Sequence, residues 1–226
     1  ALLGVSVAQL SLLINTQIAS HVAVGAVSWL TYADRLMEFP TALLGVALGV
    51  VLTPQLAAAQ ARAQGDEYSS LLDWGLRAVV LLAAPCAVAL LAFPQALVAV
   101  LFHYGRFGAA DVAQTVGAVM GWGVGLLGIV AVKVLAPGFF ARQDTKTPVK
   151  VGIVAMVANM LLNLLLIWPL AHAGLALATA LSAFLNAGLL GYLLYRQGVL
   201  VFQHGWGPYV VQLGGGSLLM GAALYF

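Results

Sequence analysis

Long uncharged stretches are the feature that most limits how this chain can fold. They run through most of its 226 residues and contain no Asp, Glu, Lys or Arg: 1–33, 39–61, 78–105, 112–132, 151–195 and 197–226. A helix that crosses the hydrocarbon core of a bilayer needs about 20 mostly apolar residues. Within lipid, a helix also satisfies its own backbone hydrogen bonds. The sequence therefore predicts an all-α, polytopic membrane helix bundle.

Composition excludes the main alternatives. Hydrophobic residues make up 63% of the chain and charged residues only 7%, with a mean hydropathy of +1.04. Soluble domains carry about 25% charged residues, and disordered chains combine low hydrophobicity with high charge. The net charge of +2 is far from the basic excess of nucleic-acid-binding domains, so no nucleic-acid partner is expected. The single cysteine, Cys86, cannot form a disulfide within the chain.

About seven transmembrane helices are expected. The stretch 151–195 is long enough for two of them, and Trp168–Gly174, which contains a proline and a histidine, is the natural break. The expected helices lie near residues 5–26, 29–58, 72–101, 112–138, 148–168, 174–196 and 207–226. The chain begins at Ala1 inside one apolar stretch and ends at Phe226 inside another, so we expect it to be a fragment of a longer protein.

Basic residues in the short connections predict the orientation of the helices. The connections after the second, fourth and sixth expected helices hold Arg62, Arg142, Lys146, Lys150 and Arg196. The connections after the first, third and fifth hold only Arg106. Cytoplasmic loops of membrane proteins are enriched in Lys and Arg, so the first set is predicted to be cytoplasmic.

A charged cluster interrupts the second expected helix. Asp34, Arg35 and Glu38 fall within five residues and are followed by Pro40. Charges within a membrane are costly and usually face a bundle interior or an aqueous cavity. In one interpretation, Arg35 pairs with Glu38 and the cluster only stabilises a kink at Pro40. In the other, Arg35 points into a cavity and binds an anion, plausibly a phosphate. The cluster sums to −1, so an anion site would need cations from elsewhere.

Helix ends and ion pairs account for other polar residues. Ser70 with Asp73 resembles a capping box, which would place a helix start beside them. Asp73 and Arg77 are four residues apart and are expected to form an ion pair at the membrane interface. Thr147 followed by Pro148 predicts a helix N-cap.

Helix packing is the expected role of several small or polar residues within the apolar stretches. Glycines recur every four residues from Gly117 to Gly125, a spacing that lets membrane helices approach closely. Asn159 and Asn163 share a helix face and are expected to make hydrogen bonds between helices. Lys133 is expected to extend its ammonium group toward the lipid headgroups. The sequence contains no motif for a catalytic site, a metal or a cofactor, and none is predicted.

Two long motifs resemble one family. The first is Tyr32–Pro40 followed by Leu44–Gly49, the second is Val132–Lys150, and His172–Ala178 is a shorter third match. Together they are similar to the MurJ/MviN lipid II flippase family, within the multidrug/oligosaccharidyl-lipid/polysaccharide exporter superfamily. The resemblance runs along nearly the whole chain.

The resemblance implies a particular place for this chain in a larger fold. Family members have fourteen transmembrane helices, arranged as two six-helix lobes and a final pair. Residues 1–196 would be the second six-helix lobe, family helices seven to twelve. Residues 197–226 would be a cytoplasmic connection and family helix thirteen, part of a groove for a lipid tail.

The resemblance also implies a function. Such proteins are transporters, not enzymes, in the bacterial cytoplasmic (inner) membrane. They move the undecaprenyl-pyrophosphate-linked peptidoglycan precursor, lipid II, from the inner to the outer leaflet by alternating access. Arg35 matches the family arginine that faces the central cavity, and Asp34 and Glu38 match its acidic neighbours, so these three are the expected substrate-binding residues. The expected partners are lipid II, membrane lipid and the missing N-terminal lobe.

Other functions remain open from the sequence. A polysaccharide-lipid flippase or a drug antiporter of the same superfamily is the first alternative. A membrane enzyme acting on polyprenyl-linked substrates is the second, although such an enzyme needs a nucleophile with a base or an acidic metal site.

Overall fold

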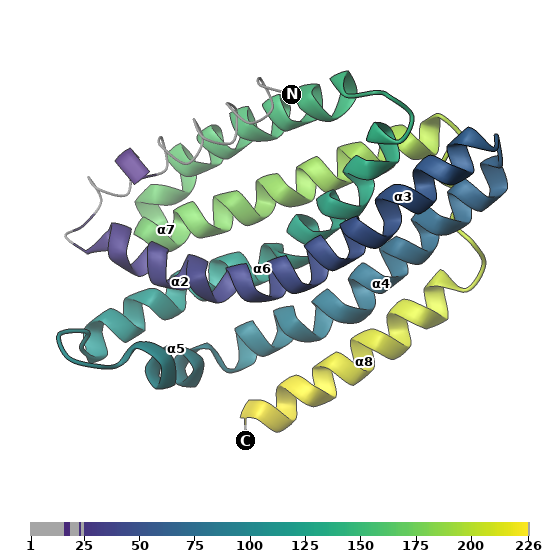
Figure 1. Cartoon of the computed structure of the whole chain (residues 1–226). Coiled ribbons are helices and arrows are strands. Elements are labelled where there is room, and N and C mark those ends of the chain that lie inside the picture. Colours follow the sequence, from purple (N-terminus) through teal and green to yellow (C-terminus); the bar gives the residue numbers. More distant parts are fainter. Residues whose placement is uncertain (1–15, 19–22, 24, 226) are drawn as a thin grey trace.

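The computed structural model describes residues 16–18, 23 and 25–225, and every regular element in these residues is helical. After a short helical turn at residues 16–18, long helices run roughly antiparallel to one another (Figure 1). The helices are α2 (Ala26–Pro40), η1 (Thr41–Val46), α3 (Ala47–Ala61), α4 (Gly65–Ala92), α5 (Pro94–Phe102), α6 (Ala109–Phe140), α7 (Lys146–Arg196) and α8 (Trp206–Tyr225).

Four helical runs are long and apolar enough to cross a membrane. They are Ala26–Ala61, Gly65–Ala92, Ala109–Phe140 and Lys146–Arg196. The predicted polytopic all-α bundle is therefore confirmed, whereas the number of seven spans is not. The first predicted helix, 5–26, lies mostly outside the described residues.

Helix α4 departs from its prediction at both ends. It begins at Gly65, so the proposed capping box at Ser70 and Asp73 is wrong: both residues lie inside the helix. It ends at Ala92, and Phe93 adopts a non-helical backbone (φ −131°, ψ 33°) before α5 starts at Pro94. The predicted helix 72–101 is thus two helices, because a residue that precedes proline is disfavoured in the α conformation.

Pro40 distorts the second predicted helix without ending it. Because proline has no N–H to donate to the preceding turn, the α-helical ladder is interrupted there. The following residues, Thr41–Val46, form the π-helical turn η1, after which α3 continues in the α form. The kink predicted at Pro40 is therefore a π-helical turn inside one membrane-length run.

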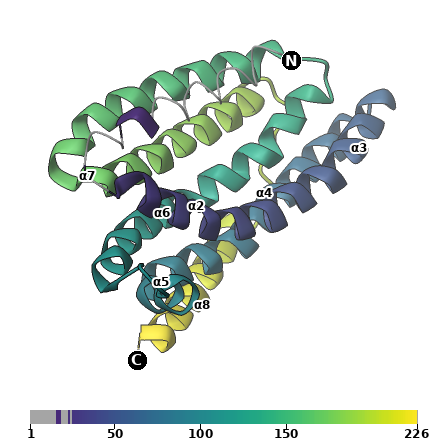
Figure 2. The ribbon, with the colours of Figure 1, turned by 60° about the vertical axis from the view of Figure 1, so that its left-hand side comes forward.

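Helix α7 is a hairpin rather than a straight rod. At Ala171 the backbone leaves the helical region (φ 49°, ψ −130°), within the predicted break Trp168–Gly174. The two halves fold back on each other and lie side by side (Figures 1 and 2). The Asn159 side chain donates a hydrogen bond to Thr179 Oγ1 across the halves at 3.4 Å, as predicted. Its bond from Asn163, at 3.2 Å, lies within the first half.

Glycines let α6 and the second half of α7 approach closely. A Cβ atom at Gly121 would lie 2.9 Å from the Cβ of Ala176, and one at Gly125 would overlap the backbone of Ala180. These two glycines are four residues apart and face small side chains on α7. The packing role predicted for the glycine spacing is confirmed.

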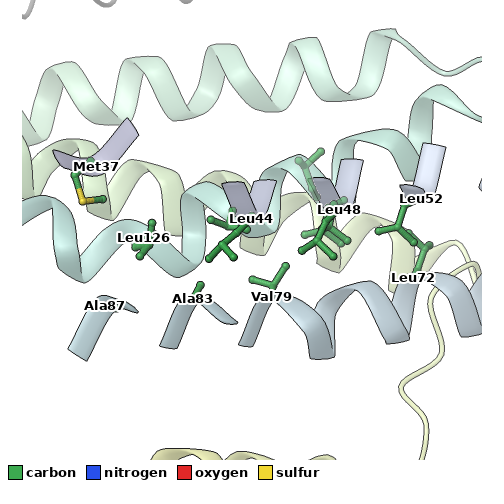
Figure 3. Close-up of a cluster of buried hydrophobic side chains, with 14 of the residues drawn as sticks. Met37, Leu44, Leu48, Leu52, Leu72, Val79, Ala83, Ala87 and Leu126 are labelled. Carbon is green, nitrogen blue, oxygen red and sulfur yellow. The ribbon is translucent and has the colours of Figure 1, made fainter. Parts of the chain in front are cut away.

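The core lies where α2, η1 and α3 pack against α4 and α6. Met37, Leu44, Leu48 and Leu52 point from this run toward side chains of the two neighbours (Figure 3). The labelled partners are Leu72, Val79, Ala83 and Ala87 of α4 and Leu126 of α6. Burial of this stripe fixes which face of α2 points away from the core.

The start of α7 is capped by Asp144, not by Thr147 as predicted. The Asp144 carboxylate accepts hydrogen bonds from the backbone N–H groups of Lys146 and Thr147 at 3.1 and 3.0 Å, and from the Thr147 hydroxyl at 2.6 Å. The Thr147 bonds, above all the hydroxyl, hold the pKa of Asp144 below its ordinary value. The connection before α7 also meets the connection after it, because Arg142 Nη1 donates to Gln197 Oε1 at 2.6 Å.

Candidate functional site

Helix α2 presents its charged residues on the side away from the core. Ala33 and Met37 are buried, whereas Asp34, Arg35 and Glu38 are exposed. This division follows from the helical period, because residues four apart share a face and their neighbours point elsewhere. The charged residues therefore form a cluster on a surface that the described residues leave open.

Arg35 and Glu38 form the ion pair that their spacing predicts. Arg35 Nη1 lies 2.9 Å from Glu38 Oε2, and the two side chains are 66% and 57% exposed. The Nε and Nη2 groups of Arg35 have no hydrogen-bond partner among the described residues. The guanidinium group thus keeps donors available for a further acceptor.

A pocket of about 280 Å³ lies between α2, α6 and α7 beside this cluster. Its walls are formed by Thr16, Val27, Leu30, Thr31, Asp34, Met37, Glu38, Thr41, Trp122, Ile129 and Thr179. Two of the three predicted site residues, Asp34 and Glu38, are in this set, and Arg35 is not. Within the described part of the chain, Arg35 therefore points to the open side of α2 rather than into this pocket.

Lys133 lies against the distorted part of the same run. A Cβ atom at Gly45 of η1 would overlap Cδ of Lys133, so the glycine leaves the space that the lysine stem fills. Lys133 is half-buried rather than fully exposed. The contact with η1 could not be predicted, because nothing in the local sequence links residue 45 to residue 133.

A polar and aromatic cluster joins three helices at the end where α7 turns back. Trp29 Nε1 donates to Asp111 Oδ1 at 2.8 Å, and the Trp29 and His172 rings lie 5.1 Å apart. His172 Nε2 lies 2.8 Å from the backbone oxygen of Gln114. These contacts fix the starts of α2 and α6 against the turn of α7, and so fix the direction in which α2 presents its charges.

At the opposite end, an apolar groove of about 500 Å³ opens on the surface of the bundle. Its walls come from α4, α6 and the second half of α7, together with Phe202 in the connection before α8 and Trp206 at the start of α8. Apart from two tyrosines its lining is apolar. An apolar chain is the kind of ligand that such a surface can accept.

Comparisons with known proteins identify relatives along the full chain. The family profile described as "Lipid II flippase MurJ" matches residues 1–226. A lipid II flippase MurJ of Burkholderia cenocepacia is 50% identical over 226 residues, all of this chain and 44% of that protein. A probable lipid II flippase MurJ of Vibrio cholerae is 42% identical over 226 residues, again all of this chain and 43% of that protein. The chain thus spans less than half the length of these relatives.

Solved structures share the fold. A lipid II flippase MurJ in an inward closed conformation superposes with a TM-score of 0.85 over 98% of this chain and 45% of that one, at 19% identity. An outward-facing multidrug transporter of the MATE family superposes with a TM-score of 0.77 over 97% of this chain and 50% of that one, at 16% identity.

Proposed function

Because the chain belongs to the MurJ family of lipid II flippases, we propose that it is part of a transporter that moves lipid II from the inner to the outer leaflet. The observation that carries the proposal is the family match over all 226 residues. The chain is a multi-pass membrane helix bundle, and we place it in the bacterial inner membrane, as the family implies.

The substrate-binding residues in this proposal are Arg35, Glu38 and Asp34. Arg35 supplies a fork of donors that suits a pyrophosphate, and its exposed position on α2 leaves that fork accessible. Glu38 holds the guanidinium group in place through the 2.9 Å ion pair. Asp34 and Glu38 line the adjacent pocket, where their oxygens would accept hydrogen bonds from sugar hydroxyl groups.

The charge of the site supports a second lobe as a partner. Asp34, Arg35 and Glu38 together carry −1, which disfavours an anion at this surface alone. The chain also covers only 44% of the Burkholderia relative. We therefore assign residues 1–196 to the second lobe of the transporter and expect an N-terminal lobe to supply further cations across the cleft.

The lipid tail needs a different surface from the headgroup. Residues 197–226 would form the connection and the helix that contribute to the tail groove. The apolar groove with Phe202 and Trp206 in its wall supports this assignment. The tail would then stay in an apolar environment while the headgroup occupies the charged site.

The physical task is to carry a pyrophosphate through hydrocarbon. An unpaired charge there is strongly unfavourable, so the transporter must replace the hydration of the headgroup with its own donors. Rocking of one lobe against the other would open the site to each leaflet in turn. The fold alone does not choose the substrate, since a multidrug transporter shares it, but the family match favours lipid II over a drug.

Complementation tests the proposal. The full-length protein would be expressed in cells depleted of their own lipid II flippase, as wild type, Arg35→Ala and Arg35→Lys, with membrane levels measured by blotting. Arg62→Ala is the matched control, because Arg62 is also exposed but pairs with Glu67 at 3.7 Å at the far end of α3.

We expect rescue by wild type and Arg62→Ala, partial rescue by Arg35→Lys and none by Arg35→Ala at normal membrane levels. Full rescue by Arg35→Ala would remove Arg35 from the binding site. Failure of wild type, although present in the membrane, would favour another exporter of the superfamily.

A further inference from the structure

Asp73 is a buried carboxylate that accepts hydrogen bonds from its own helix and from one distant segment of the chain. Its side chain is 2% exposed, although it lies in a membrane-length helix. Oδ2 accepts from Arg77 Nε at 2.8 Å. Oδ1 accepts from Trp206 Nε1 at 2.6 Å and from the Gln203 backbone N–H at 3.2 Å. All three partners are donors, so only an acceptor at this position satisfies them.

Arg77 adds further contacts between α4 and the segment Gln203–Tyr209. Its Nη2 donates to the backbone oxygens of Gln203 and His204 at 3.2 and 3.1 Å. The Tyr209 hydroxyl donates to the Arg77 backbone oxygen at 2.7 Å. The guanidinium carbon lies 5.4 Å from the centre of the Trp206 ring and 5.7 Å from that of Tyr209, within the range of cation–π attraction.

These contacts join the first turn of α8 to α4. It packs along α4 at the edge of the bundle (Figures 1 and 2). Near its outer end, a Cβ atom at Gly221 would lie 2.8 Å from Val88 Cγ1 of α4. Between these points, Cβ atoms at Gly214, Gly215 and Gly216 would meet nothing within 4 Å. The polar contacts to Asp73 and Arg77 therefore fix the first turn of α8 against α4.

We propose that Asp73, supported by Arg77, is a positioning residue that anchors the start of α8 to α4. The anchor consists of the two side chains of α4 and the segment Gln203–Tyr209. It holds Trp206, and with it the adjacent Phe202, in the wall of the apolar groove. That last step rests on the proposed function, whereas the anchor itself does not.

The anchor differs from a simple i,i+4 ion pair in a way that can be tested. If only the attraction between Asp73 and Arg77 mattered, exchanging the two residues would restore it. In the exchanged protein, however, an arginine at position 73 would face Trp206 Nε1 and the Gln203 N–H, which are donors. Buried donors left without an acceptor are strongly unfavourable. The exchange should therefore fail.

Thiol labelling measures the position of α8 directly. Ser217 is 4% exposed on the face of α8 that packs against α4, whereas Leu218 beside it is 70% exposed. In the full-length protein with its native cysteines replaced, Ser217→Cys reports separation of α8 and Leu218→Cys reports general access. Each is labelled with a maleimide in membranes and the rate is measured.

We expect Asp73→Ala and the double exchange Asp73→Arg/Arg77→Asp to raise the labelling rate of Ser217→Cys at least about tenfold. The rate at Leu218→Cys should stay unchanged. Glu67→Ala is the matched control: it removes an exposed carboxylate from the same helix and should leave both rates unchanged. Trp206→Phe keeps an aromatic ring and removes one donor, so it should raise the Ser217→Cys rate by a smaller factor.

Protection of Ser217→Cys in the double exchange would overturn the anchor in favour of a simple ion pair. If Asp73→Ala does not reach the membrane, Trp206→Phe decides: an unchanged rate there overturns the proposal. Complementation with the same variants separates the two proposals. If the variants label faster at Ser217→Cys but still rescue growth fully, the anchor is supported and the groove does not depend on it for transport.

Discussion

The Asp73–Arg77 and Arg35–Glu38 ion pairs have the same chemistry and similar helical spacing, but they differ in burial. The Asp73 and Arg77 side chains are 2% and 26% exposed, and those of Glu38 and Arg35 are 57% and 66% exposed. The buried carboxylate binds donors from a distant segment, whereas among the described residues the exposed pair bonds only within its own helix. The comparison teaches that what packs on a helix face, not the pair itself, decides whether an ion pair is structural or available to a ligand.

The largest expected effect on stability is at the buried pair. Asp73→Ala leaves Arg77 Nε and two further donors without their acceptor. Because Arg77 is partly exposed, we expect a loss near the lower end for broken buried pairs, about 3 kcal/mol in the free energy of unfolding. Unfolding of the purified full-length protein in detergent measures it, with Glu67→Ala as control. If Asp73→Ala lost no more unfolding free energy than Glu67→Ala, the buried pair would contribute no more to stability than an exposed one.

Gly125→Ala tests whether close packing of an uncharged, buried position affects the free energy of unfolding as much as the buried ion pair does. A Cβ atom there would overlap the Ala180 backbone, and overpacking of this kind costs about 1–3 kcal/mol. Gly152→Ala is the control, because a Cβ atom at Gly152 would meet nothing within 4 Å. The same unfolding measurement applies. Equal stability of the two variants would contradict the close α6–α7 contact.

We expect the loss of the Asp144 side chain to change the free energy of unfolding by less than loss of Asp73 and by more than loss of Arg35. Loss of its cap in Asp144→Ala should destabilise the protein by about 1 kcal/mol. Because its pKa is lowered on folding, this stabilisation is fully present above the ordinary aspartate pKa of about 3.9. It is lost as the pH falls through the lower folded-state value. Unfolding measured from neutral to acid pH should show the difference from wild type disappear in acid.

The smallest effect on stability is expected at the exposed pair. Arg35→Ala should change the free energy of unfolding by less than about 0.5 kcal/mol, because exposed ion pairs contribute little. It should nevertheless abolish complementation. A loss of stability as large as that of Asp73→Ala would mean that Arg35 acts in folding, and the contrast between the pairs would disappear.

Much of the fold could be predicted because apolar length and local breaks are properties of the sequence itself. The uncharged stretches predict the bundle, and Pro40 and Trp168–Gly174 predict distortions that the structure has. The extra break at Phe93 was missed, although Pro94 was its signal. The helix start at Gly65 is not predicted, because Ser70 and Asp73 resemble a capping box and so suggest a later start.

The contacts at the polar sites also divide into those that local spacing predicts and those that it does not. Spacing within one helix predicts both ion pairs, and the structure has them. Burial of Asp73 could not be predicted, because its partners Gln203 and Trp206 are more than 125 residues away in the chain. The contact between Gly45 and Lys133 could not be predicted for the same reason, because the two residues are far apart in the chain. The substrate-binding role of Arg35, Glu38 and Asp34 stays a prediction.

The hairpin shape of α7 has a consequence for how the chain enters a membrane. Lys146 and Lys150 stand at its start and Arg196 at its end, and the contact between Arg142 and Gln197 brings the two ends together. The stretch 151–195 between them has no charged side chain. Moving an arginine or lysine through the centre of a bilayer costs about 2.5–3.5 kcal/mol even by insertion scales. The hairpin can insert as one unit with its basic residues left behind on one side, so biogenesis of this segment requires no charge to cross.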